Sequence, residues 1–344
     1  MLVIDQSNKP IMKREKWIDI LRGIAILAVV IDHLFVLYPQ FRINLLWKHM
    51  YFSIAWFVFL SGYTSVLSAQ KSKIWTFPKS YFLYYAKRFT ILIPYFSASL
   101  LIFLWENNFR LPQLVWSEFW HKLLYFSSQP TYYFVNLICQ LYLVFPLLFH
   151  LLKISKTRWE KIILSLTVLI LAFIILPFKA PSWPFSPPGR IFGGVYFAAF
   201  FLGMLLAQKA IILNKFTSIL SGFSFAIFEF YFIYAQGNFL SVAPDFLLIG
   251  WSISLLLVAK VFWDKFKTAK WPILFPLSIL GKHTLSIYLF HFFILGYALQ
   301  YKFTNHFIQF IVIFFSALSI PIIPGMIYGK LITTYKIFHK KALN

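Results

Sequence analysis

Arg22 and His33 are the residues of this 344-residue chain whose types and spacing most directly suggest chemistry. Both lie in the apolar stretch Trp17–Leu37, 11 positions apart. At 3.6 residues per turn this is about three turns, so they share one helix face and lie about 16 Å apart along its axis. A guanidinium binds phosphate through a planar fork of donors, and an imidazole can gain or lose a proton near neutral pH. One face of this helix therefore presents a phosphate-binding cation and, well across the membrane, an acid–base group.

Two acids accompany this pair, and simpler interpretations stay open. Arg22 could extend to the headgroups, and His33 could be a histidine at the membrane interface. The shared face, with Asp19 and Asp32 close by, favours function. Asp32 is rotated about 100° from His33 on an ideal helix, so we expect it to pair with a neighbouring helix. His291, in a late apolar segment, could bond between helices or belong to a site.

The composition indicates an integral membrane protein. Hydrophobic residues make up 60% of the chain, aromatic residues 22% and charged residues only 12%, and the mean hydropathy is +0.75. A soluble domain carries about 25% charged residues. These values exclude a soluble enzyme, a disordered chain, a coiled coil and a disulfide scaffold. The single cysteine, Cys139, leaves no intramolecular disulfide, and no metal-binding motif is present, so we expect no metal.

The apolar segments predict an all-α polytopic protein with about ten transmembrane helices. A bilayer core of about 30 Å needs roughly 20 apolar residues per helix. Segments that are apolar all round, without period-two alternation, favour helices over a barrel. They lie near 17–38, 47–69, 89–105, 132–152, 162–178, 191–208, 216–235, 241–260, 284–301 and 307–328.

The net charge of +22 is explained by its placement. Of the 32 Lys and Arg residues, 23 fall on the side of the N-terminus. Cytoplasmic loops collect Lys and Arg, so we expect both termini in the cytoplasm and no nucleic acid as a partner. The predicted domains are a cytoplasmic leader (1–16), a membrane domain (17–328) and a basic cytoplasmic tail (329–344).

Several motifs, in order, carry a resemblance to a known family. The segment 17–33, WIDILRGIAILAVVIDH, resembles the first span of the acyltransferase family 3 membrane proteins. FVFLSGY (57–63), the basic pair before IPY (93–95), the Gln140-x-Tyr142 segment and GKHTLSIYLFH (281–291) resemble later motifs of the same family. The resemblance covers nearly the whole chain.

The resemblance implies an acetyl-CoA-dependent O-acetyltransferase of a bacterial plasma membrane, acting on the cell envelope. The acceptor would be a hydroxyl of a cell-surface polysaccharide or of its lipid-linked precursor. His33 would be the general base, with Asp32 and His291 as further catalytic candidates. The implied donor-binding residues are Arg22, Lys87 and Arg88 for the coenzyme A phosphates, with Asp19 orienting Arg22. Those implied for the acceptor are Trp183, Arg190 and Ser61. Membrane-belt tryptophan and helix packing are the simpler accounts of Trp183 and Ser61.

The chain departs from the family pattern at one point that bears on mechanism. Ile138 and Cys139 stand where some members carry a glutamate, so no role for that acid is inferred. No appended extracytoplasmic domain is expected either. These features are closest to compact sugar O-acetylases.

Three other interpretations remain. A transporter or flippase of lipid-linked sugar would fit ten basic-inside spans, but we expect neither repeat halves nor broken helices here. An unrelated membrane-bound acyltransferase would place its essential histidine late in the chain, for example at His291. A purely structural membrane protein would leave the polar face of the first span without purpose. The sequence leaves the acceptor sugar, the acyl group and the oligomeric state open.

Overall fold

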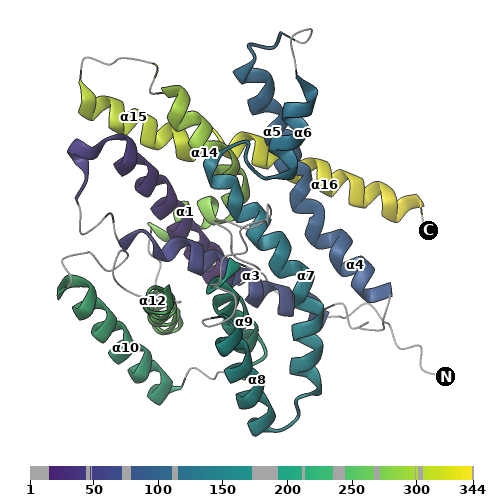
Figure 1. Cartoon of the computed structure of the whole chain (residues 1–344), viewed down its shortest axis with the longest axis vertical. Helices are drawn as coiled ribbons and strands as arrows, with labels where there is room; N and C mark the ends of the chain where they lie inside the picture. The colour runs from purple at the N-terminus through teal and green to yellow at the C-terminus, as the bar shows by residue number, and fades with distance from the viewer. Residues whose placement is uncertain are drawn as a thin grey trace.

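The computed structural model is a bundle of helices (Figure 1). It describes residues 15–43, 47, 49–71, 79–110, 115–172, 193–210, 214–234, 245–266, 272–298, 300 and 305–342, and no strand occurs among them. The α-helices are α1 (Lys16–Leu37), α3 (Phe52–Lys71), α4 (Lys79–Arg88), α5 (Leu92–Glu106), α6 (Trp116–Leu124), α7 (Tyr133–Ile154), α8 (Arg158–Ile170), α9 (Tyr196–Ala207), α10 (Lys215–Tyr234), α12 (Asp245–Phe266), α13 (Leu274–Lys282), α14 (Thr284–Ala298), α15 (His306–Ser319) and α16 (Ile322–Ala342). Short 3₁₀ turns are η1 (Pro39–Phe41), η2 (Phe89–Ile91) and η4 (Pro130–Tyr132).

Six helical stretches within the described ranges are long and apolar enough to cross a membrane. They are Lys16–Leu37, Phe52–Gln70, Tyr81–Glu106, Pro130–Ile154, Leu247–Phe266 and His306–Leu331. Each overlaps a predicted span, which confirms the all-helical class and a membrane protein. The predicted spans 162–178, 191–208 and 216–235 overlap α8, α9 and α10. The total of ten spans and the side on which the termini lie stay predictions, and the predicted domain boundary at 328–329 falls inside α16.

The third span begins earlier than predicted. Lys87 and Arg88 were expected just before it, but α4 continues through η2 into α5, and both residues lie inside the stretch Tyr81–Glu106. The apolar pattern did not reveal this continuation, because α4 carries six Lys, Arg and Tyr side chains besides its apolar ones.

A break in the helix comes directly before the ninth predicted span. α13 and α14 meet at His283 with a bend of 85°. The expectation of no broken helix is therefore wrong, and the predicted segment 284–301 missed α13. Pro276 is the third residue of α13. At that position a backbone N–H has no partner within the helix, so proline is tolerated.

Glycines allow two helix pairs to touch through their backbones. A Cβ on Gly62 of α3 would lie 2.0 Å from the carbonyl oxygen of Phe200 in α9, and a Cβ on Gly203 would lie 2.0 Å from that of Phe59. A Cβ on Gly23 of α1 would lie 2.0 Å from the Leu277 oxygen of α13. Small residues at helix crossings are the usual route to close packing within membranes.

A fourth close approach lies just before the bend between α13 and α14. A Cβ on Gly281 would lie 1.7 Å from the backbone oxygen of Asp19. Gly23 and Gly281 thus form a reciprocal contact that holds α13 on α1, two residues before the bend at His283. The glycine of the Leu-Arg-Gly motif is explained by this packing.

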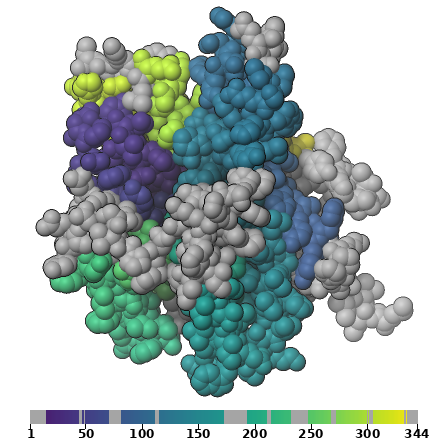
Figure 2. All heavy atoms as spheres, viewed as in Figure 1, coloured from purple at the N-terminus to yellow at the C-terminus, as the bar shows by residue number. Residues whose placement is uncertain are grey.

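The basic end of the molecule is the end at which α1 begins and α3, α7 and α9 finish. Gln70, Lys153 and Gln208, from the ends of α3, α7 and α9, line one cavity there. At the far end of α1, the rings of Phe35 and Tyr38 lie 6.4 and 5.9 Å from that of Phe310 in α15. Figure 2 shows the surface of α1, in purple, beside that of the late helix α15, in yellow-green, at its upper left. The distribution of Lys and Arg predicts that the basic end faces the cytoplasm.

Adding a methyl group at Gly281 should damage this packing, whereas the same change at Gly296 should not. Gly281→Ala places a carbon against the backbone of α1, and overpacking typically costs about 1–3 kcal/mol. We expect a clearly lower thermal unfolding midpoint, or no folded protein, in detergent. Gly296→Ala is the matched control, because no described atom lies within 4 Å of its Cβ. Equal stability of the two variants would contradict the backbone contact.

Candidate active site

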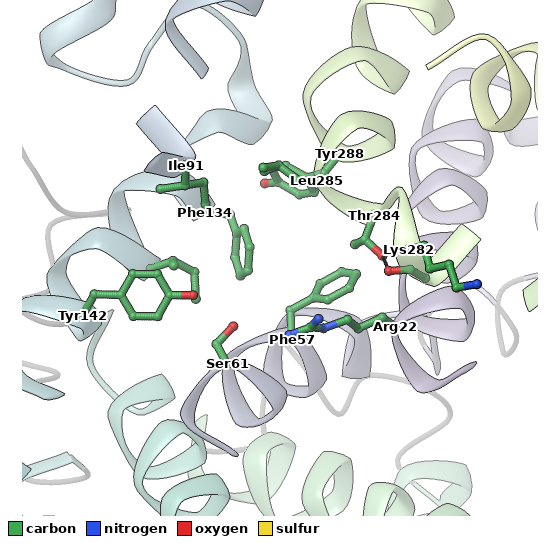
Figure 3. A pocket seen from close by; sticks show the side chains of 12 residues that line it. Arg22, Phe57, Ser61, Ile91, Phe134, Tyr142, Lys282, Thr284, Leu285 and Tyr288 are labelled. Carbon is green, nitrogen blue, oxygen red and sulfur yellow. Dashed lines mark hydrogen bonds between the residues drawn. The ribbon is translucent and has the colours of Figure 1, made fainter. Parts of the chain in front are cut away.

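A cavity of about 210 Å³ opens at the break between α13 and α14 (Figure 3). α1, α3 and α7 supply its other walls. Its lining comprises Arg22, Phe57, Ser61, Ile91, Phe134, Ile138, Tyr142, Gly281, Lys282, Thr284, Leu285 and Tyr288. In Figure 3 the hydroxyls of Ser61 and Tyr142 point toward the space, whereas the ammonium of Lys282 points away. The cavity is therefore a half-apolar pocket with its polar groups gathered on a few side chains.

Two guanidinium groups converge on Thr64 of α3. Arg22 from α1 donates to the Thr64 hydroxyl oxygen at 3.3 Å, and that hydroxyl donates to the Leu60 carbonyl at 2.8 Å. Arg88 from the end of α4 donates to the Thr64 carbonyl oxygen at 3.1 Å. One residue thus holds two cations in place. Charged groups are costly within a membrane, so two guanidiniums brought together there mark a functional site.

Arg88 also borders the cavity. Its guanidinium carbon lies 5.2 Å from the ring centroid of Tyr142, which lines the cavity, and 5.6 Å from that of Tyr84. Its Nε is buried and has no hydrogen-bond partner among the described residues. A donor in this state can still bind an incoming oxygen. Lys87 points elsewhere along α3, where its Nζ donates to the Ser68 hydroxyl at 3.0 Å.

His33 lies against His291 of α14. Their ring centroids are 5.2 Å apart with an interplanar angle of 25°, and the edge of Phe292 packs on His33 at 5.3 Å. The His33 side chain is 24% exposed, whereas His291 is completely buried. Of the two imidazoles, only His33 is open to a substrate.

The tautomer of His291 is fixed by its own helix. Its Nδ1 lies 2.8 Å from the Tyr288 carbonyl oxygen and 3.0 Å from that of Ile287. Carbonyl oxygens only accept, so Nδ1 carries the proton and Nε2 keeps its lone pair. This Nε2 is buried and has no hydrogen-bond partner in the described part of the chain. His291 therefore presents an acceptor beside His33 and no charge.

Tyr288 separates the cavity from the histidine pair. It lines the cavity, its ring centroid is 5.8 Å from that of His291, and its hydroxyl donates to the Thr131 carbonyl. Neither histidine is among the described residues that line the cavity. The cation-bearing end and the imidazole end of the site are thus joined through one aromatic side chain of α14, with both ends facing α1.

The aspartates of α1 take different positions. Asp19 is 3% exposed and lies where α1 meets α13, so its predicted role in orienting Arg22 stays a prediction. The Asp32 Oδ2 is 3.8 Å from the His33 Nδ1, which is longer than a hydrogen bond. Asp32 therefore makes no hydrogen bond to the imidazole next to it, although the two lie within ion-pair distance.

The remaining predicted site residues divide into two groups. Ser61 lies in the cavity wall, close to Arg22. Trp183 and Arg190 lie outside the described residues. Thr64, Tyr288 and the break at His283 were not among the predicted site features. Thr64 follows Ser61 by three positions and so shares its helix face, and the polar run 281–284 within an apolar segment was a signal for the break.

The fold and this site define a helical membrane protein with a cation-lined cavity beside a pair of stacked imidazoles. A family model described as an acyltransferase domain, acyltransferase family 3, matches residues 15–326. The chain therefore belongs to acyltransferase family 3, as the motifs indicated, and this family supports an acyltransferase activity. Comparison with curated proteins gives no match, and neither does comparison with solved structures.

The distance between Asp32 and His33 predicts that the carboxylate is dispensable for the acyl-transfer step. Asp32→Asn keeps the shape of the side chain and removes its charge, and no hydrogen bond to His33 is lost. We expect a kcat for acyl transfer within about tenfold of the parent, less than the 10²–10⁴-fold loss typical of a missing general base. Steady-state kinetics of the purified variant measure this. A loss as large as that of a His33 variant would mean that Asp32 orients the imidazole during turnover.

Proposed function

We propose that the protein is a membrane O-acyltransferase that moves an acetyl group from acetyl-CoA to a hydroxyl of a cell-surface polysaccharide or its lipid-linked precursor. The observation that carries the proposal is the order of groups along α1 and α14. Two guanidiniums at Thr64 come first, then the cavity, Tyr288 and the His33–His291 pair. Coenzyme A has the same order, with phosphates at one end and a thioester at the other. The membrane context suits an acceptor made or displayed at the envelope.

The residues present fit part of the donor. Arg22 and Arg88 would hold its phosphates, because charge-assisted bonds from a guanidinium fork match phosphate oxygens. Lys87 would add a third cation nearby. The cavity of about 210 Å³ is below the roughly 300–1,000 Å³ of whole-ligand pockets, so it takes only part of the molecule. The half-apolar lining between Phe57 and Tyr288 suits the thin pantetheine arm.

His33 is the group that would act on the acceptor. When bound, the thioester supplies an activated acetyl group. The partly exposed imidazole of His33 would take the proton of the acceptor hydroxyl while the hydroxyl oxygen attacks the thioester carbonyl and forms the ester bond. The C–S bond would break, and His33 would then pass the proton to the departing thiolate. His291, fully buried and fixed by two carbonyls, would hold the His33 ring through stacking. Ser61 lies in the cavity wall near Arg22, at the proposed phosphate end. The acceptor role predicted for Ser61 would instead require a position near His33.

One observation favours a second candidate function, a transporter or flippase of lipid-linked sugar. Transporters often place their substrate at a discontinuous helix, and the bend of 85° at His283 lies in the cavity wall. A broken helix also suits an enzyme, since irregular backbone is tolerated wherever it lines a cavity. Purified protein in detergent separates the two, because only the enzyme releases free coenzyme A from acetyl-CoA in the presence of acceptor.

Mass analysis of surface glycan tests the acceptor class. Cells that carry the gene should show a mass increase of one acetyl group on a glycan unit, and cells without it should not. Base treatment should remove the added mass, because the product is an ester. An unchanged glycan with acetyl on another envelope molecule would reassign the acceptor, while the acyltransferase activity would stand.

Replacement of His33 should abolish turnover while leaving the fold intact. For His33→Ala we expect about a 10²–10⁴-fold lower kcat for acetyl transfer, because the base that activates the hydroxyl is missing. The unfolding midpoint should stay close to that of the parent, since the side chain is only partly buried. His150→Ala, at an exposed position of α7, is the control and should keep full activity. Near-normal transfer by the His33 variant would remove the base assignment.

Replacement of Arg22 should affect the donor rather than the acceptor. Hydrogen bonds to charged groups are worth about 1.5–3 kcal/mol. We therefore expect Arg22→Gln to raise the KM for acetyl-CoA by about 10-fold to 150-fold at little change in the acceptor KM. Lys265→Gln, on the exposed end of α12, is the control for loss of one positive charge. A rise in the acceptor KM alone would contradict the phosphate role.

A further inference from the structure

A second cavity lies at the basic end and is not used by the site described above. Its volume is about 590 Å³, within the range of about 300–1,000 Å³ typical of ligand pockets. α3, α7, α8 and the residue after α9 enclose it. Its lining comprises Ala69, Gln70, Phe149, Leu152, Lys153, Ser155, Lys156, Lys161 and Gln208. It therefore combines an apolar wall with three lysines, two glutamines and a serine.

The charge of this cavity is positive. Lys153, Lys156 and Lys161 contribute to the lining, and no acid is among the described residues that form it. The nearest acid in sequence, Glu160, makes its hydrogen bonds to backbone N–H groups. Its carboxylate accepts from the backbone N–H of Thr157 and of Lys156, and these bonds hold the pKa of Glu160 below its usual value. Glu160 therefore caps α8 instead of neutralising the lysines, and the cavity is suited to an anion with multiple negative charges.

A row of hydroxyls on α3 runs from the site toward the basic end. Ser61, Thr64 and Ser68 are spaced by three and four positions, so they share one face of α3. Ser61 lies in the first cavity, Thr64 holds Arg22 and Arg88, and Ser68 holds Lys87. Gln70, two residues further, lines the second cavity from another face of α3, about 200° around the helix from Ser68. From Ser61 to Gln70 the helix rises roughly 13 Å, so the second cavity lies nearer the basic end than the first.

We propose that the second cavity binds the 3′-phosphate and adenosine of coenzyme A, with Lys153, Lys156 and Lys161 around the phosphate. This inference rests on the proposed function and extends it to the nucleotide end of the donor. The diphosphate then passes the end of α3, at Lys71, to reach Arg22 and Arg88. The pantetheine arm continues through the first cavity toward Tyr288 and His33. The apolar side chains of Phe149 and Leu152 provide a surface for the adenine ring.

The 3′-phosphate can be removed from the donor, which gives a direct test. Acetyl-3′-dephospho-CoA should show a KM at least tenfold above that of acetyl-CoA with the parent protein, at similar kcat. The triple variant Lys153→Gln, Lys156→Gln, Lys161→Gln should raise the KM for acetyl-CoA by a similar factor and leave that for the dephospho donor unchanged. Lys330→Gln, on the exposed face of α16, is the control and should resemble the parent. An equal KM for both donors in the parent would overturn the proposal.

A second measurement does not depend on turnover. Adenosine 3′,5′-bisphosphate should bind the purified full chain in isothermal titration calorimetry, at least tenfold more tightly than adenosine 5′-monophosphate. The triple lysine variant should lose this preference. A lysine-dependent affinity for phosphatidylglycerol vesicles, with no preference for the bisphosphate, would assign the cavity to lipid headgroups and overturn the proposal. If the bisphosphate binds as expected but no acyl-CoA is consumed, the proposed function fails while the nucleotide site stands.

Discussion

The backbone contact between α1 and α13 is the constraint on which the rest of the site depends. Gly23 and Gly281 allow each helix to touch a carbonyl of the other, at distances that any side chain would block. The bend at His283 follows two residues after this contact, so it sends α14 back along α1. His291 is thereby placed against His33 and Tyr288 near the cavity. Without close packing at the glycines, the polar residues of the two helices would not face one another.

The cost of placing charge among apolar helices explains the surroundings of the arginines. A guanidinium has five N–H donors, and each one left unpaired in a low-dielectric interior is expensive. Thr64 offers one oxygen from its side chain and another from its backbone, and Tyr142 offers a ring face. These partners satisfy only part of the donor capacity, since the Nε of Arg88 stays without one in the described residues. Arg88 is thus held in place while one of its N–H donors has no partner among the described residues, and such a donor favours an anionic ligand.

The sequence predicted the class, most of the long spans and the family, because each rests on a strong local signal. Runs of about 20 apolar residues identify helices such as α1 and α7 directly, and the order of motifs identified acyltransferase family 3. The helical period also placed Arg22 and His33 on one face. What the sequence left open depends on contacts between helices. The partner of His33, the role of Thr64 and the bend at His283 all require α14 to be packed on α1.

The two cavities also show why the direction of the helices matters. α1 runs from the basic end toward His33, and α3 runs the opposite way, so Thr64 comes level with Arg22 while Ser68 and Gln70 lie closer to the basic end. Cations therefore accumulate on the side from which a cytoplasmic donor would arrive, and the partly exposed imidazole lies beyond them. The proposed donor, with phosphates at one end, would bind here with its thioester directed toward the imidazole. Recognition of its phosphates and placement of its thioester would then depend on the same helices.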